Sequence, residues 1–309
     1  MNYGIPYQGS KSKIVADLCR VFPKADHFYD LFGGGFSVTH YMLAHRSKDY
    51  GSFHFNEIRP GITTLVSDAI AGKYNYDVFN PKWVSCDEFH AKKDLDPYIK
   101  MIWSFGNAGN SYLFGKEIEP HKRSMHNAVV FNDFDDYAKK WLGMDRFAEG
   151  YSILQRRLYV RSRGKLNAMR GDIQQLEQLE RLERLQQLEQ LQQLQQLERL
   201  ERLEQLERLE LTSVSYEQVD IKPNSIIYCD IPYDGTADYD GNTTFDRAKF
   251  LEWADAQTKP VYISEYNISD SRFTCLGSLQ KRALRSHNKT MVTKQERVYV
   301  NASGARRCG

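Results

Sequence analysis

The hydrophobic positions of the first 75 residues change period several times. Apolar side chains within residues 13–22 fall on one helical face, which predicts a short helix. The apolar run at 27–32 is short enough for a buried strand, and three glycines follow it directly. The same patterns predict a helix over 36–44, a strand over 52–55 and a helix over 60–71. This order predicts the first half of an open, nucleotide-binding type of α/β unit.

The rest of the chain divides into segments of different character. Residues 76–172 are rich in aromatic, Asn and Lys residues, which favours an inserted, irregular or helical domain. Short apolar runs return after residue 212, and they predict strands at 225–229, 260–264 and 297–301. We therefore expect one α/β domain made of residues 1–75 and 212–309.

A low-complexity repeat occupies residues 173–211. Leucine stands at every third position from Leu176 to Leu209, with almost only Glu, Gln and Arg between. These residue types favour a helix, which would be about 50 Å long. A three-residue step turns about 300° on an α-helix, so the leucines circle the axis and form no heptad seam. A 3₁₀ helix and a short-period solenoid stay open, and we expect either an expandable non-catalytic insertion or a surface for self-association or partner contact.

Length and composition are those of a globular protein. The chain has 309 residues, 41% hydrophobic and 27% charged, which is room for roughly two domains. Its apolar runs are far too short to span a bilayer, and no apolar secretory segment stands near its start, so we expect no membrane partner. Five scattered cysteines without a CxxC or Cys/His cluster predict neither disulfides nor a metal site, which favours the reducing cytoplasm.

Charge is unevenly distributed along the chain. The formal net charge is +2, but residues 174–211 carry nine Glu and five Arg, which leaves 37 basic and 31 acidic residues elsewhere. Residues 155–170 hold six Arg and Lys and no acid. Such a run attracts a polyanion such as nucleic acid, and it is also compatible with an ordinary solvated surface.

Three motifs carry candidate chemistry. The glycines that follow Asp30 let a backbone approach a ligand closely between strand and helix, although a plain tight turn would look the same. Glu57 follows the next predicted strand, where an acid can accept hydrogen bonds from ribose hydroxyls, or can simply lie on the surface. Residues 230–233, Asp-Ile-Pro-Tyr, leave a predicted central strand with an acceptor, a rigid backbone and a stacking face.

Together these residues resemble the Dam-like DNA adenine-N6 methyltransferases, whose motifs run in the same order. Residues 7–11 resemble the family's aromatic-x-Gly-Gly-Lys segment, 30–35 its FxGxG-type loop, and 230–233 its Asp-Pro-Pro-Tyr. Tyr7 stands for Trp, Ser10 for Gly and Ile231 for the first Pro. The resemblance implies a Rossmann-like methyltransferase sheet in an α/β fold, with an inserted target-recognition domain at 76–172 and the helical repeat.

The resemblance also implies roles for particular residues. Asp230, Ile231, Pro232 and Tyr233 would be catalytic. S-adenosyl-L-methionine would be bound by Tyr7, Gln8, Gly9, Ser10, Lys11, Asp30, Phe32, Gly33, Gly34, Gly35, Glu57, Ile58 and Asp230. The partner would be double-stranded DNA, contacted by Asn107, Asn110, Tyr112, Arg123, Arg156, Arg157, Arg161, Arg163 and Lys165.

The implied reaction needs no covalent enzyme intermediate. The exocyclic amine of adenine is a poor nucleophile, and acceptors on Asp230 and on the Ile231 carbonyl would orient its two protons. The adenine must leave the duplex, and Tyr233 would stack on it. Ile231 supplies the same carbonyl as the family's proline, with a less rigid backbone.

Other functions stay open at this stage. A nucleic-acid-binding protein on a catalytically impaired methyltransferase scaffold is one, suggested by Ile231 and the repeat. A nicotinamide oxidoreductase is another, although the chain lacks the GxGxxG fingerprint. RNA or the N4 amine of cytosine could also accept the methyl group by the same chemistry.

The repeat generates a first prediction. Shortening it between Leu176 and Leu209 in whole triplets should leave methyl transfer largely intact, because leucine spacing is preserved and no catalytic motif is touched. Methylation of duplex DNA by trimmed variants measures this, and loss of folding on any trimming would contradict it.

Overall fold

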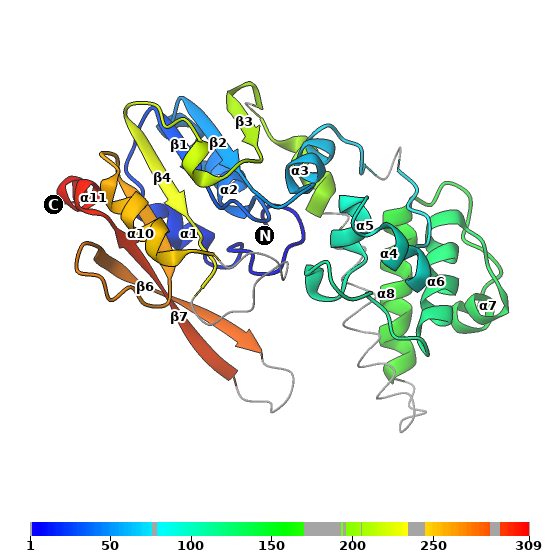
Figure 1. The fold of residues 1–309 in the computed structure, drawn as a ribbon. Helices are drawn as coiled ribbons and strands as arrows, with labels where there is room; N and C mark the ends of the chain where they lie inside the picture. Colours follow the sequence, from blue (N-terminus) through cyan, green and yellow to red (C-terminus); the bar gives the residue numbers. More distant parts are fainter. Residues whose placement is uncertain are drawn as a thin grey trace. The chain divides into compact units, whose positions relative to one another are not determined.

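The structure, a computed structural model, describes residues 2–75, 79–169, 193, 196–204, 206–233, 245–284 and 291–308. It divides into two compact units (Figure 1). Residues 1–67 and 202–309 form the first, here called the sheet unit, and residues 68–201 form the second, the helical unit. The division falls within helix α3 (Ile62–Ile70).

The sheet unit is built on one seven-stranded sheet. Its order is β3-β2-β1-β4-β5-β7-β6, and the first five strands in this order run parallel while β7 is antiparallel to both of its neighbours. The strands are β1 (His27–Asp30), β2 (Ser52–Asn56), β3 (Leu209–Thr212), β4 (Ser225–Cys229), β5 (Val261–Glu265), β6 (Thr274–Leu284) and β7 (Met291–Val300). The mixed α/β class with a seven-stranded sheet is consistent with the Rossmann-like fold that the sequence predicts.

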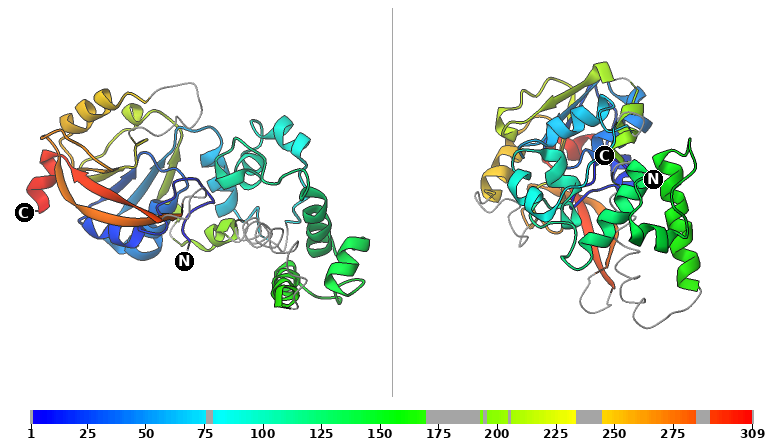
Figure 2. Two further views of the ribbon diagram at one scale, coloured as in Figure 1. Left: turned by 90° about the horizontal axis from the view of Figure 1, so that it is seen from below. Right: turned by 90° about the vertical axis from the view of Figure 1, so that its right-hand side faces the viewer.

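Helices cover both faces of this sheet (Figures 1 and 2). On one face Tyr29, Ile227 and Ile263 pack with Phe250 in a buried cluster. On the other face Phe22 contacts the rings of strand residues from β1, β4 and β5. Because both faces are covered, the central strands are apolar throughout rather than alternating. The helices of this unit, with α3 ending beyond it, are α1 (Val15–Leu18), α2 (Ser37–Arg46), α3, α10 (Arg247–Ala256) and α11 (Ala302–Cys308).

The strand order reverses between β1 and β4. The chain moves outward from β1 to β2 on one side and from β4 to β5 on the other. The carboxyl ends of β1 and β4 therefore leave the sheet side by side, with helices diverging from them. In open α/β sheets this switch point leaves a crevice in which ligands bind.

The helical unit contains five α-helices between residues 79 and 169. Three of these helices begin at a side-chain acceptor: Ser85, Asp96 and Asp135 each accept a backbone hydrogen bond from the first turn of the helix that follows. The helices are α4 (Cys86–Lys92), α5 (Pro97–Ile102), α6 (Glu119–Phe131), α7 (Asp136–Leu142) and α8 (Ile153–Met169). One buried apolar cluster joins α6, α7 and α8.

The carboxyl-terminal part of the leucine repeat differs from the prediction. Residues 170–192 lie outside the described part of the chain, but Leu197 and Leu200 are fully buried. Two 3₁₀ turns follow, η4 (Arg199–Arg202) and η5 (Leu206–Arg208). The expected helix is wrong for residues 209–211, which together with Thr212 form strand β3 against β2. Triplet trimming must therefore be confined to residues before 193, because later leucines fill the core or enter the sheet.

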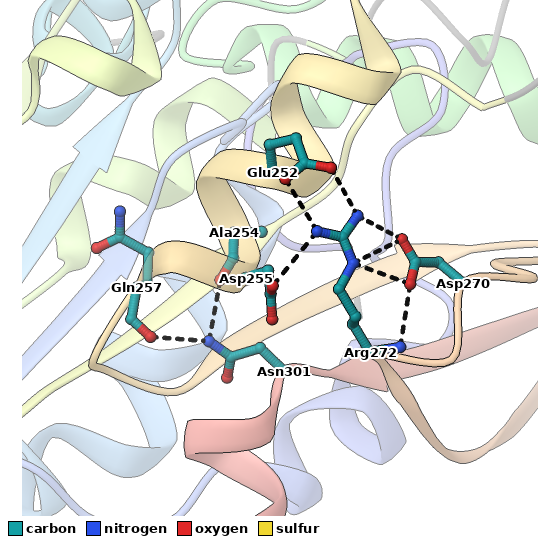
Figure 3. A network of polar contacts seen from close by, with 7 residues as sticks. All are labelled: Glu252, Ala254, Asp255, Gln257, Asp270, Arg272 and Asn301. Atoms are coloured by element: carbon teal, nitrogen blue, oxygen red, sulfur yellow. Dashed lines mark hydrogen bonds and ion pairs between the residues drawn. The ribbon is translucent and has the colours of Figure 1, made fainter.

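Two polar groups of different burial join α10 to the end of the sheet (Figure 3). Asn301 is 1% exposed; its amide nitrogen lies 3.0, 3.3 and 3.1 Å from the carbonyl oxygens of Ala254, Gln257 and Lys259. Its oxygen accepts the N–H of Val261 at 3.1 Å. Arg272 instead makes ion pairs in the more exposed part of the same region, with Glu252, Asp255 and Asp270.

These two groups predict unequal costs on mutation. Asn301→Ala should lower the free energy of unfolding by roughly 2–4 kcal/mol, because several buried backbone groups lose their partner. Arg272→Ala should cost much less, since water replaces its lost partners. Urea unfolding of both variants measures the difference, and equal losses would contradict the assignment.

Candidate functional site

A cavity of about 730 Å³ opens at the switch point of the sheet unit. It lies at the carboxyl ends of β1 and β4, where the fold favours ligand binding. Every residue that the sequence singles out as catalytic or cofactor-binding lines it: Tyr7, Gln8, Gly9, Ser10, Lys11, Asp30, Phe32, Gly33, Gly34, Gly35, Glu57, Ile58, Asp230, Ile231, Pro232 and Tyr233. Segments more than 200 residues apart in the chain thus meet in one cavity.

The glycine turn after β1 leaves no room for side chains. A Cβ on Gly33 would lie 2.1 Å from the ring of Phe55, and one on Gly35 would lie 2.4 Å from Cβ of Tyr7. Gly34 has a φ of +49°, in the left-handed region that favours glycine. The turn therefore brings bare backbone to the wall of the cavity.

Glu57 holds this turn from the end of β2. Its side chain accepts the N–H of Gly34 at 2.7 Å and that of Arg59 at 3.0 Å. Arg59 in turn donates to the hydroxyl of Tyr7 at 2.7 Å and lies 5.2 Å from its ring centre. The carboxylate, the cation and the ring form one connected side of the cavity.

Asp30 is a buried acid at the end of β1. It is 1% exposed; Oδ2 accepts the hydroxyl of Thr39 at 2.8 Å, and Oδ1 has no hydrogen bond among the described residues. Burial raises the pKa of Asp30 to about 7, because the charged form loses its hydration, and the nearby Asp230 and Glu57 add to the rise. An acceptor thus lies in the cavity wall with one oxygen unused.

Asp230 belongs to a buried ionic cluster. The ammonium of Lys11 lies 2.6 Å from Oδ1 of Asp230 and 3.4 Å from Oε1 of Glu296 on β7. The same ammonium donates to the hydroxyl of Tyr233 at 2.6 Å. Lys11 is 4% and Glu296 is 1% exposed, so a single cation is shared by two carboxylates away from bulk water.

The pKa values of this cluster follow from its charges. Burial lowers the pKa of Lys11, but Asp230 and Glu296 raise it more, so the net shift is upward and the amine stays protonated. Burial and the same two carboxylates raise the pKa of Tyr233, which stays a neutral phenol. Its ring packs edge-on against Tyr266 at a centroid distance of 4.4 Å.

Ile231 lies in the hydrophobic core rather than in solvent. It is 2% exposed and belongs to the cluster that contains Tyr29, Leu31 and Phe250. An apolar side chain anchored in this way fixes the backbone that follows Asp230. Core packing thus supplies part of the restraint that a proline ring would give at this position.

Several lining residues were not singled out from the sequence. The ring of Phe32 lies 5.3 Å from that of Tyr216 and 5.7 Å from that of Phe245, which makes an aromatic wall. Glu296 was also missed, although its strand was expected. The unpredicted lining residues are Ser37, Val38, Arg59, Ser215, Tyr216, Glu217, Tyr228, Phe245, Asp246, Lys249 and Tyr266. Some of them follow a strand or precede a helix, a position that many residues share, whereas Val38, Tyr228 and Lys249 lie within α2, β4 and α10 and carry no local sequence signal.

The residues expected to contact DNA all belong to the helical unit, but their burial differs. Tyr112 is 8% exposed and donates to the carbonyl of Val84 at 2.7 Å, and Arg157 is 9% exposed. Arg156 is half-buried and lies 3.3 Å from the carbonyl of Val129 at the end of α6. Asn107 and Arg163 are half-buried, Asn110, Arg123 and Arg161 are exposed, and the side chain of Lys165 lies outside the described part.

Comparison with known proteins relates the amino-terminal part of the chain to a family of enzymes. Residues 7–60 match the model of the D12 class N6 adenine-specific DNA methyltransferase family. This stretch includes the aromatic-x-Gly segment, the glycine turn and Glu57, and it confirms the resemblance to Dam-like adenine methyltransferases. A search of curated proteins found no match. The match indicates an N6-adenine DNA methyltransferase, a class of enzyme whose substrate is DNA.

Two absences concern only the described residues. None of their helices is long and apolar enough to cross a membrane. No group of three or more His, Cys, Asp and Glu side chains among them is arranged to hold a metal ion.

The burial of Asp30 predicts a pH-dependent stability. Unfolded Asp ionises above its ordinary pKa of 3.8, whereas folded Asp30 stays neutral until about 7. The stability that neutral Asp30 contributes is therefore fully present below pH 3.8. It is lost as the pH rises through about 7. Relative to wild type, Asp30→Asn should gain stability across this interval and level off above it.

Thermal unfolding of both proteins across this interval measures the difference. Asp17→Asn is the matched control, because Asp17 is an exposed acid on α1 that pairs only with the exposed Arg20 among the ion pairs of the described residues. A stability difference between wild type and Asp30→Asn that does not change with pH would contradict the assigned pKa.

Proposed function

We propose that this protein transfers a methyl group from S-adenosyl-L-methionine to the N6 amine of adenine in double-stranded DNA. The observation that carries the proposal is one cavity in which the glycine turn, Glu57 and Asp230–Tyr233 meet. The family match supports the amino-terminal half of this set, and the geometry adds the residues that follow β4.

The cavity suits the cofactor in shape and charge. Its lining includes four acids, Glu57, Glu217, Asp230 and Asp246, besides Asp30 with its raised pKa, against three cations, Lys11, Arg59 and Lys249. This excess of acid favours a ligand that carries a sulfonium and an ammonium group. The unused oxygen of Asp30 is a free acceptor for a donor group, and Phe32 with Tyr216 offers a stacking surface for a purine. Glu57 would bind ribose hydroxyls, beside the exposed Ile58.

S-adenosyl-L-methionine supplies an electrophilic methyl group when bound. The protein orients the target amine toward this methyl group. Asp230 and the carbonyl of Ile231 accept the two N–H groups of the amine. Tyr233 stacks on the everted base, as a neutral phenol that adds no charge. Asp230 or water then takes the proton that the amine loses, so no covalent bond to the enzyme is needed.

The helical unit would bind the DNA duplex. Its segment 82–170 has 16 basic and 11 acidic residues, and the exposed Arg123, Arg161 and Asn110 can reach phosphates or base edges without rearrangement. Further contacts with the DNA would come from Asn107, Arg156, Arg163 and Lys165. Tyr112 and Arg157 would act indirectly, by holding the helices that present the others.

The decisive test is methyl transfer to duplex DNA with labelled cofactor. Asp230→Asn should lower kcat by at least about a hundred-fold, because a carboxylate acceptor is lost where positive charge develops. Asp220→Asn, which changes an exposed acid that does not line the cavity, is the control and should keep wild-type activity.

The same assay separates the alternatives. No transfer to any DNA by the wild type, with DNA binding retained, would favour a nucleic-acid-binding protein on an impaired scaffold. Transfer to RNA or to cytosine N4 alone would keep the chemistry and change the substrate.

A further inference from the structure

The ammonium of Lys11 occupies the acceptor that the reaction needs. It lies 2.6 Å from Oδ1 of Asp230 and 2.6 Å from the hydroxyl of Tyr233. On the proposed function, these are the groups that must contact the target adenine. A lysine cation there also opposes the positive charge that develops on the amine during transfer. The ammonium must therefore be drawn aside when the base enters.

A second carboxylate is in place to draw it aside. Oε1 of Glu296 lies 3.4 Å from the ammonium, longer than a good hydrogen bond, and accepts no hydrogen bond among the described residues. Glu296 is 1% exposed and also interacts with the Tyr233 hydroxyl, and a closer counter-ion stabilises a buried carboxylate. A small shift of the ammonium toward Glu296 would shorten the ion pair that already joins them.

Other ionisable groups near the ammonium do not offer the same exchange. Tyr228 is bonded to Ser264 at 2.9 Å, and Tyr233 already accepts from Lys11. Asp30, at the end of β1, is bonded to Thr39. Glu296 is thus the carboxylate besides Asp230 that the structure places beside Lys11 in the described part of the chain.

We propose that Glu296 is a positioning residue that receives the Lys11 ammonium when the target amine binds to Asp230. Without the base, the Lys11 ammonium lies closest to Asp230 and Tyr233 and farther from Glu296. With the base, the ammonium moves closer to Glu296, and Asp230 accepts the amine. This inference rests on the proposed function and names a residue that orients the site without touching the substrate.

Glu296→Gln tests the proposal, because it removes the charge and keeps the shape. The ammonium then has one carboxylate left and stays on Asp230, so kcat near neutral pH should fall about tenfold or more, while KM for cofactor and for DNA stays within about threefold. The difference in kcat between wild type and Glu296→Gln should become smaller as the pH rises toward the pKa of Lys11, because a neutral Lys11 amine no longer competes for Asp230. A merely structural role for Glu296 would give a deficit that does not depend on pH.

A double-mutant cycle shows whether Glu296 acts through Lys11. In a Lys11→Met background the added Glu296→Gln change should lower kcat by less than about twofold, because no ammonium remains to be moved. Glu265→Gln is the matched control, a fully buried carboxylate on the neighbouring strand that pairs with Arg247 instead. Thermal unfolding of each variant checks that the proteins are folded.

The outcomes separate the two proposals. Additive effects of Lys11→Met and Glu296→Gln, or wild-type kcat in Glu296→Gln, would overturn the role of Glu296 and leave the methyltransferase assignment standing. If Glu296→Gln fails to fold, Glu296→Asp replaces it. The shorter carboxylate should retain part of kcat, and its loss of kcat relative to wild type should also become smaller as the pH rises. A folded wild type that methylates no nucleic acid would overturn the proposed function, and this inference with it.

Discussion

The ion pair between Lys11 and Asp230 joins two segments of the sheet unit that are far apart in the sequence. It connects the amino-terminal segment with the residues that leave β4, and its cation is buried. Burying a cation and two carboxylates is unfavourable unless they stay paired, so the pairing constrains where both segments can lie. The glycine turn, Tyr7 and Glu57 then close the same cavity from β1 and β2. The position of the site is therefore set by where the Lys11 ammonium can pair with carboxylates.

The central strands of the sheet can be predicted from the sequence. Predicted strands at 27–32, 52–55 and 225–229 match β1, β2 and β4 closely, because buried parallel strands are short apolar runs that end at glycine or acid. Strand β3 could not be predicted from the sequence, because Leu209–Thr212 follow a repeat of strong helix formers. Pairing with β2 overrides that local preference, because an edge position satisfies backbone hydrogen bonds that residues 52–56 leave open.

The candidate site was predictable where its residues follow strand ends. Asp30, Glu57 and Asp230 stand at such positions, and topology alone brings strand ends together. Glu296 lies inside a strand and is brought to the site by the register of β7, which no local pattern encodes. Among the residues expected to contact DNA, Tyr112 and Arg157 show a second limit: residue type suggests a contact, but burial depends on packing between helices.

The edge strand β3 also marks where one periodicity gives way to another. Leucines recur every third residue up to Leu209, but Leu209 and Leu211 are two apart, with the exposed Glu210 between them. Glu210 bonds His54 at 2.8 Å, and Arg208 donates to the carbonyl oxygens of Ser47 and Tyr50. The Arg-Leu-Glu pattern of these anchors also occurs upstream, at 199–201 and 202–204, but no upstream triplet has a second leucine two residues after the first, so Leu211 marks one alignment of β3. Gain or loss of triplets during evolution would thus leave the alignment of the sheet unchanged, so the gene could tolerate repeat-length variation beside a catalytic fold.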